Sequence, residues 1–228
     1  AFELAGKEKY WGAETDVRKT KDDKFVLVHE PTLQKMCDVN KRPEDMTFDE
    51  IRSLKITGGN NISKYKNITS ANRIASLQEY LEVCKKYSMV PLIEIKVESK
   101  NGDKINMSKE DLELLYETVQ GIMGENEYTF TSFDLDTVVD MYHIKRKRGD
   151  NNIKLRHIVN HPNTQNITYY KKRGIQLDCD YRNVSIATLQ RFQEAGLTMC
   201  VWTIDDQELA WDYIQAGADY ITTNTKFW

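Results

Sequence analysis

Two pairs of charged residues, each pair separated by one residue, are the features of this sequence that could carry out chemistry. Glu14 and Asp16 lie in a stretch that resembles a strand, so their carboxylates would leave the same face about 6 to 7 Å apart. Glu94 and Lys96 repeat this spacing in a second apolar stretch. Buried charges are costly unless a cation or hydrogen bonds compensate them. Three carboxylates and one ammonium group would compensate one another around a hard divalent ion.

The placement of the two pairs favours this interpretation over simple surface charge. Taken alone, either pair is explained as well by solvent exposure at a sheet edge or by an ion pair between Glu94 and Lys96. Both pairs, however, lie near the carboxyl ends of predicted parallel strands, which is the edge where such sheets hold their active sites. Their joint position therefore predicts a metal site.

His29 is a third candidate, because it ends the apolar run 25–28 just after a polar segment, 20–24, that predicts a hairpin. The hairpin would return His29 over the end of the strand that carries Glu14 and Asp16. An imidazole there could protonate a departing alkoxide, since its ordinary pKa lies near neutral pH. A histidine at a strand end is also commonly a structural hydrogen-bonding residue, so position alone does not assign the role.

The elements that must position these residues alternate between short β-branched runs and segments of helical period, which predicts an α/β fold around a parallel sheet. Strands are predicted at residues 11–17, 25–29, 90–96, 128–132, 155–159, 174–177, 198–202 and 220–223. Helices are predicted at residues 48–54, 77–87, 109–121, 135–147, 167–173, 186–195 and 207–215, with a further helix-like segment at 2–10. Counting the first two runs as one βα step leaves seven strand positions, one fewer than a TIM (β/α)8 barrel requires. We therefore expect either an open sheet or a barrel whose first strand precedes Ala1. Residues 1–228 are predicted to form one domain, with residues 57–72 as a long loop or small insertion.

Composition excludes several classes of protein. The chain has 228 residues, 32 basic and 35 acidic, and its 40% hydrophobic content is too high for a disordered chain. No apolar stretch approaches the roughly 20 residues of a membrane-spanning helix, so no stable membrane insertion is expected.

The basic run 145–148 lies at a predicted helix end, where cations are favoured, and predicts no nucleic-acid partner. Four widely separated cysteines and no visible export signal favour the cytoplasm, with secretion left open.

Seven motifs, taken in order, resemble the signature of the glycerophosphodiester phosphodiesterases. Each fragment is weakly specific, but their order and spacing extend over nearly the whole chain. The motifs are Glu14-Thr15-Asp16-Val17, Thr20-Lys21-Asp22, Val28-His29-Glu30-Pro31-Thr32-Leu33, Ser76-Leu77-Gln78-Glu79-Tyr80-Leu81, Ile93-Glu94-Ile95-Lys96, Val201-Trp202-Thr203-Ile204 and Gly217-Ala218-Asp219-Tyr220-Ile221-Thr222-Thr223.

The resemblance implies a TIM barrel that hydrolyses glycerophosphodiesters to an alcohol and glycerol 3-phosphate with one divalent ion, Mg²⁺ or Ca²⁺. It implies that the substrate is a small-molecule glycerophosphodiester, and it leaves the oligomeric state open. The residues that match the family pattern are Glu14, Asp16 and Glu94 as metal ligands, Lys96 as a phosphate-binding residue, His29 as a catalytic histidine, and Trp202 and Phe133 as substrate-binding residues.

The sequence departs from the family pattern in two places. Glu30 follows His29 where the family usually has aspartate. A His-Arg-Gly motif at the end of the first strand, which supplies a second histidine and a phosphate-binding arginine, has no counterpart here. We expect both this motif and the missing strand to precede Ala1.

Two other functions remain open at this point. A related barrel enzyme of phospholipase D type acts on choline phospholipids with a similar site. A catalytically silent barrel could bind phosphodiesters or a protein partner, since the first histidine has no counterpart. Head-group choice cannot be predicted, because it depends on loops without a readable code.

Overall fold

The computed structural model describes residues 1–59, 62, 72–100 and 103–227. These residues form two compact units, Ala1–Tyr128 and Thr129–Trp228. Most of the loop predicted at residues 57–72 lies outside the described residues, and the prediction of a single domain stays a prediction.

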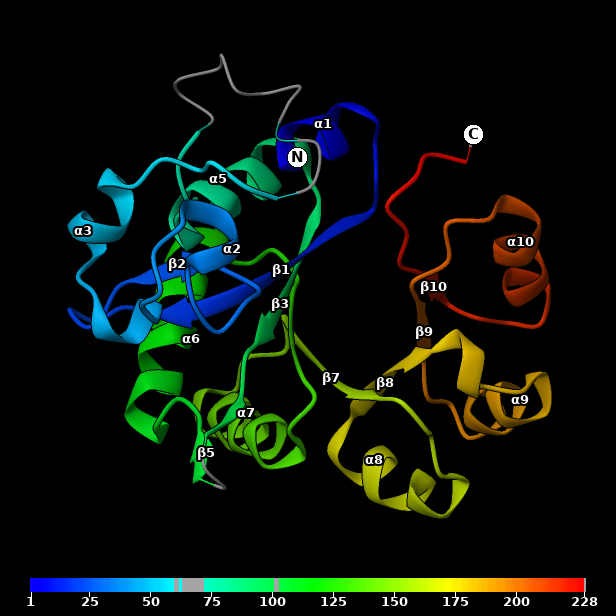
Figure 1. The fold of residues 1–228 in the computed structure, drawn as a ribbon. Coiled ribbons are helices and arrows are strands. Elements are labelled where there is room, and N and C mark those ends of the chain that lie inside the picture. The colour runs from blue at the N-terminus through cyan, green and yellow to red at the C-terminus, as the bar shows by residue number, and fades with distance from the viewer. Residues whose placement is uncertain (60–61, 63–71, 101–102, 228) are drawn as a thin grey trace. The chain divides into compact units, whose positions relative to one another are not determined.

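The first unit contains a sheet in which β1 lies between β3 and β2 (Figure 1). β1 runs parallel to β3 and antiparallel to β2, so β1 and β2 form the predicted hairpin. The strands of this unit are β1 (Gly12–Lys19), β2 (Phe25–Leu27), β3 (Val90–Ile95) and a separate hairpin of β4 (Glu98–Lys100) and β5 (Asp103–Ile105). Its helices are α1 (Phe2–Lys7), α2 (Gln34–Cys37), the 3-10 helix η1 (Pro43–Asp45), α3 (Phe48–Ser53), α5 (Leu77–Tyr87) and α6 (Lys109–Met123).

Helix α5 begins at a capping residue and packs against the sheet of the first unit. Ser76 caps α5, because its hydroxyl accepts a hydrogen bond from the backbone N–H of Glu79 while the Glu79 carboxylate accepts one from the backbone N–H of Ser76. Tyr80 of the same helix is buried, and its hydroxyl donates to the carbonyl of Ala13 and accepts from the N–H of Leu92. The side chain of Tyr80 therefore links helix α5 to β1 at Ala13 and to β3 at Leu92.

Gly12 allows the close approach of β1 and β3 at the start of their pairing. A Cβ atom at this position would lie 2.6 Å from the carbonyl oxygen of Val90 and 2.7 Å from Cδ1 of Leu92. Only glycine fits this space without displacing backbone. The strand pairing then continues through Glu14 opposite Leu92 and Asp16 opposite Glu94.

The second unit contains strands in the order β6-β7-β8-β9-β10, with β8 parallel to both β7 and β9, and β10 parallel to β9. The strands are β6 (Tyr128–Ser132), which begins at the boundary between the units, β7 (Ile153–Val159), β8 (Ile175–Asp180), β9 (Met199–Trp202) and β10 (Tyr220–Ile221). The helices are α7 (Leu135–Arg148), η2 (Thr164–Asn166), α8 (Ile167–Arg173), η3 (Tyr181–Asn183), α9 (Ile186–Glu194) and α10 (Gln207–Gln215). Helices and strands alternate along this part of the chain, as the sequence predicts.

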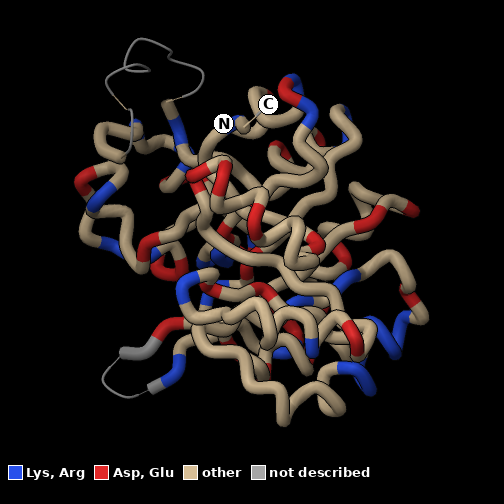
Figure 2. Tube along the Cα trace, turned by 90° about the vertical axis from the view of Figure 1, so that its right-hand side faces the viewer, with Lys and Arg blue, Asp and Glu red and all other residues tan. Residues whose placement is uncertain are grey.

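Charged residues of both signs are interspersed along the chain (Figure 2). The four cysteines are buried and free. Across the described part of the chain, no helix combines the length and apolarity needed to cross a bilayer.

Candidate active site

The parallel register of β1 and β3 brings three carboxylates together. Asp16 lies opposite Glu94 across the two strands, and Glu14 precedes Asp16 by two residues on the same face of β1. One carboxylate oxygen from each of Glu14, Asp16 and Glu94 lies within 4.8 Å of the others. Glu94 is the most buried of the three, with 8% of its surface exposed. Three oxygen donors at this spacing are the donor set that Mg²⁺ and Ca²⁺ prefer, so these side chains fit such an ion.

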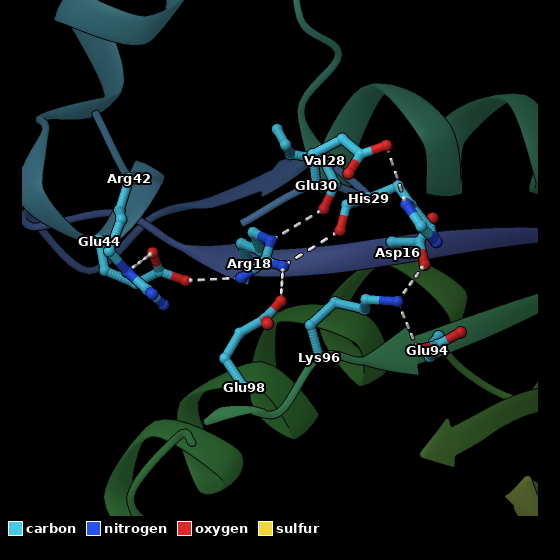
Figure 3. Close-up of polar contacts among 10 residues, drawn as sticks. All are labelled: Asp16, Arg18, Val28, His29, Glu30, Arg42, Glu44, Glu94, Lys96 and Glu98. Carbon is cyan, nitrogen blue, oxygen red and sulfur yellow. Dashed lines mark hydrogen bonds and ion pairs between the residues drawn. The ribbon is translucent and has the colours of Figure 1, made fainter. Parts of the chain in front are cut away.

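Lys96 provides the positive charge beside the carboxylates (Figure 3). Its Nζ atom lies 2.8 Å from Oε1 of Glu94 and 3.2 Å from Oδ1 of Asp16. Burial lowers the pKa of Lys96, but the two carboxylates outweigh that effect and raise it overall. Burial also raises the pKa of Glu94, and the charge of Asp16 adds to this rise while Lys96 opposes it. Three carboxylates and one ammonium group leave the cluster with a formal charge of 1 − 3 = −2.

His29 follows β2 and lies close to the same end of β1. The backbone N–H of Val28 donates to the carbonyl of Asp16 over 3.1 Å, which ties this segment to the acidic strand. The side chain of His29 is 68% exposed, so a substrate could reach it. When His29 is protonated, its charge opposes the rise that burial causes in the pKa of Glu94. Glu30, the residue that departs from the family pattern, lies 3.6 Å from Nδ1 of His29 and 2.6 Å from Nζ of Lys35. Its ion pair with Lys35 lowers its pKa.

Arg18 is a residue that the sequence reasoning did not single out. It lies on the same face of β1 as Glu14 and Asp16, since the three alternate along the strand, and it is 1% exposed. Its guanidinium group contacts the backbone carbonyls of Val28 and His29 (Figure 3). The only signal in the sequence was the continued alternation of charged residues beyond Asp16.

The two predicted substrate-binding aromatics lie in the second unit. Phe133 follows β6 and Trp202 ends β9, and their ring centroids are 6.0 Å apart in an edge-to-face arrangement. Phe133 is exposed and Trp202 is half-buried. The Nε2 atom of His157 lies 3.3 Å from the carbonyl oxygen of Phe133, while its Nδ1 atom lies 2.8 Å from the hydroxyl of Tyr170. Burial lowers the pKa of His157, and these contacts fit a structural histidine.

The structure therefore places carboxylate oxygens of Glu14, Asp16 and Glu94 within 4.8 Å of one another, with Lys96 in contact with two of these residues and His29 nearby. Phe133 and Trp202 contact each other. The roles of all seven side chains stay predictions.

Comparison with known proteins identifies relatives of this chain. Residues 1–225 match the model of the glycerophosphoryl diester phosphodiesterase family. An uncharacterized protein of Mycoplasma genitalium is 29% identical over 143 residues, which cover 62% of this chain and 54% of that protein. Glycerophosphodiester phosphodiesterase 1 of Mus musculus is 27% identical over 96 residues, which cover 42% of this chain and 28% of that protein. The matches thus span about half or less of these two relatives.

A solved structure of an Oleispira antarctica phosphodiesterase, in complex with the product sn-glycerol-3-phosphate, has a TM-score of 0.79 to this chain. The likeness covers 97% of this chain and 84% of that one at 18% identity, so it concerns the fold. It confirms the α/β architecture of the TIM-barrel class predicted from the sequence. The family match over residues 1–225 shows that this chain belongs to the glycerophosphoryl diester phosphodiesterase family.

Proposed function

We propose that this protein hydrolyses glycerophosphodiesters to an alcohol and glycerol 3-phosphate with the help of one divalent ion. The observation that carries the proposal is the convergence of Glu14, Asp16 and Glu94 on one face of two paired strands, with Lys96 in contact with two of them. The family match supports the same reaction class.

Glu14, Asp16 and Glu94 are the proposed ligands of the ion, which is Mg²⁺ or Ca²⁺. When bound, the ion supplies Lewis acidity and neutralises negative charge that develops on the phosphoryl oxygens. Lys96 contributes a fixed positive charge to the same oxygens, and its burial strengthens that contribution because less water screens it.

His29 is the proposed general acid, which donates a proton to the oxygen of the departing alcohol. An alkoxide is a poor leaving group, so this proton transfer typically accelerates bond cleavage by about 10² to 10⁴. The exposure of the His29 side chain gives the substrate access to it. Phe133 and Trp202 are the proposed apolar contacts for the glycerol side of the substrate, as matched aromatic positions of the family.

The test is release of glycerol 3-phosphate from glycerophosphocholine by the full chain, measured with and without a chelator. We expect product formation that stops when the ion is removed. Glu94→Gln should abolish it and weaken Ca²⁺ or Mg²⁺ binding in calorimetry. Glu82→Gln is the matched control, because Glu82 is an exposed residue of α5 whose carboxylate accepts a hydrogen bond from the side chain of Gln78. Its activity should equal that of the unmodified chain.

Two outcomes would contradict the proposal. Hydrolysis of sphingomyelin in preference to glycerophosphocholine would favour the related choline-phospholipid activity. No product from either substrate, with intact binding of glycerophosphocholine, would favour a silent phosphodiester-binding barrel.

A further inference from the structure

We propose that Arg18 is a positioning residue that holds His29 in place for proton transfer through the main chain. This inference rests on the proposed role of His29 and extends it to a buried residue whose polar side-chain contacts in the described part of the chain are with Val28, His29, Glu44 and Glu98. Figure 3 shows Arg18 at the centre of these contacts.

The guanidinium group of Arg18 binds two consecutive carbonyls at the point where β2 ends. Its Nε atom donates to the carbonyl of Val28 over 3.0 Å, and its Nη2 atom donates to the carbonyl of His29 over 3.0 Å. Strand β2 ends at Leu27, so these two carbonyls lie beyond the β1–β2 ladder. The planar donors of arginine suit two adjacent acceptors, and they fix the direction of the backbone at His29.

Two carboxylates compensate the buried charge of Arg18. Nη1 lies 3.2 Å from Oε1 of Glu44, and Nη2 contacts Oε1 of Glu98. Glu98 follows Lys96 by two residues, at the start of β4. One guanidinium group therefore connects the segment of the proposed general acid to the segment that follows the proposed phosphate-binding lysine.

The side chain of His29 has few other restraints. It is 68% exposed, and its partner Glu30 also binds Lys35. Together with the hydrogen bond from the Val28 N–H to the Asp16 carbonyl, the contacts of Arg18 with the main chain restrain where the imidazole lies. A displacement of about 1 Å in a reacting group can cost about 10²-fold in rate. We expect Arg18→Gln to lower kcat by about 10- to 100-fold on substrates that need a proton donor, with KM and Ca²⁺ affinity changed less than about threefold.

The choice of substrate separates positioning of His29 from a general loss of stability. The alcohol of glycerophosphocholine leaves as an alkoxide and needs a proton, whereas the p-nitrophenyl diester of glycerol 3-phosphate releases a stable anion that does not. Arg18→Gln should therefore lower kcat on glycerophosphocholine strongly and on the nitrophenyl diester only slightly.

Arg52 offers a matched control in the same unit. Like Arg18, it is mostly buried and binds a backbone carbonyl, that of Ile74, together with a carboxylate, that of Glu79. These contacts join α3 to α5 and include none of the proposed catalytic residues. Arg52→Gln should reduce stability without changing the ratio of kcat between the two substrates.

A second variant and a hydrogen-exchange measurement test the same role of Arg18. Arg18→Lys retains a buried charge beside Glu44 and Glu98 but lacks the planar guanidinium group. Its kcat should fall more on glycerophosphocholine than on the nitrophenyl diester, by a smaller factor than in Arg18→Gln. This variant replaces Arg18→Gln in the test if Arg18→Gln does not fold. Hydrogen–deuterium exchange of a peptide covering residues 28–33 should rise in either Arg18 variant and stay unchanged in Arg52→Gln.

Equal losses on both substrates, or unchanged exchange at residues 28–33, would overturn the role of Arg18. If the unmodified chain hydrolyses neither diester, the proposed function fails by itself, and the exchange measurement still decides whether Arg18 holds the His29 segment.

Discussion

Replacing Lys96 with methionine should make the stability of this protein depend on divalent ions much more strongly than in the unmodified chain. The side chains have similar length, so the change removes the charge and leaves most of the packing. Without Lys96, the buried carboxylate of Glu94 and its neighbour Asp16 lose the cation that both contact.

The distances set the size of this effect. At an effective dielectric constant of about 20, an ion pair is worth about 6 kcal/mol at the Lys96–Glu94 distance of 2.8 Å and about 5 kcal/mol at the Lys96–Asp16 distance of 3.2 Å. Desolvation offsets much of this attraction, and removing one partner of a buried pair typically costs about 3 to 5 kcal/mol. We expect Lys96→Met to lose about 4 kcal/mol in the free energy of unfolding when a chelator is present.

Added Ca²⁺ should recover a large part of that loss. An ion present at about 100 times its Kd stabilises the native state by about 2.7 kcal/mol. Its affinity should be higher in Lys96→Met, because the ammonium group no longer repels it. The unmodified chain gains stability from the ion as well, so the difference between the two chains narrows only by RT ln of the ratio of their Kd values. An affinity about 30-fold higher in Lys96→Met would reduce the difference from about 4 to about 2 kcal/mol at saturating Ca²⁺.

Urea unfolding followed by far-UV circular dichroism, in chelator and in saturating Ca²⁺, measures both differences. Lys19→Met is the matched control, because Lys19 lies on the same strand and its Nζ atom contacts two carboxylates, 2.6 Å from Asp23 and 2.7 Å from Asp111. Ca²⁺ should not recover the stability that Lys19→Met loses. The reasoning is refuted if Lys96→Met loses the same stability in both conditions, or if Ca²⁺ rescues Lys19→Met equally well.

Three further predictions concern the surroundings of the site. Tyr80→Phe should cost about 2 kcal/mol of unfolding free energy, measured in urea, because it leaves the buried carbonyl of Ala13 and N–H of Leu92 without their shared partner; a cost below about 0.5 kcal/mol would contradict this. Gly12→Ala should lower the melting temperature and weaken Ca²⁺ binding in calorimetry, since its Cβ would push β1 away from β3 beside Glu14; an unchanged melting temperature would be inconsistent with that contact. The pKa of Glu79 is lowered from 4.5 to about 2 because its hydrogen bonds and ion pairs with Arg52, Ser76 and Arg73 outweigh burial, so its stabilising contribution is complete above pH 4.5 and is lost as the pH falls toward 2. After allowance for its 40% exposure, Glu79→Gln should cost about 1 to 2 kcal/mol at pH 7 and little at pH 2, and an equal cost at both pH values would argue against the ion pairs.

Most elements of the fold could be predicted because capping residues and glycines near each helix end mark where the helix begins or ends. Helices at residues 77–87, 167–173 and 207–215 occur with the predicted bounds. Ser76 and Asp206 cap two of them, and Gly174 ends the third in a left-handed conformation. These signals act within a few residues, so they need no knowledge of the rest of the chain.

The elements that were missed have weak local signals or depend on distant contacts. Helix α2 has only four residues, too few for a helical period. The hairpin of β4 and β5 has a signal in Asn101-Gly102, a pair common in tight turns, but its strands are short and polar. Strand β2 ends at Leu27 instead of His29, because the carbonyls of Val28 and His29 bind Arg18.

In the candidate site, too, the features that depend on local spacing could be predicted, and those that depend on contacts between distant segments could not. The spacing of Glu14 and Asp16 shows that they share a face, but the register that sets Asp16 opposite Glu94 depends on how two segments 78 positions apart pair with each other. Alternation extends as clearly to Arg18, yet nothing local indicates that its partners are two carbonyls at the end of β2. Contacts between distant main-chain atoms have no sequence signature, which is why a positioning residue was missed where candidate ligands were found.

The charges of the cluster indicate why a mobile histidine would be unsuitable here. Glu14, Asp16 and Glu94 with Lys96 have a formal charge of 1 − 3 = −2, which one divalent ion would neutralise. A phosphodiester anion that enters such a neutral site adds one negative charge, and a protonated His29 would balance it. Donation of that proton would leave a neutral imidazole and a neutral alcohol, and direct transfer requires His29 to lie within hydrogen-bond reach of the departing oxygen. An exposed imidazole on an unrestrained loop would spend much of its time in water. The buried guanidinium group of Arg18, whose charge is balanced by Glu44 and Glu98, binds the His29 carbonyl and limits this motion together with the hydrogen bond from the Val28 N–H to the Asp16 carbonyl.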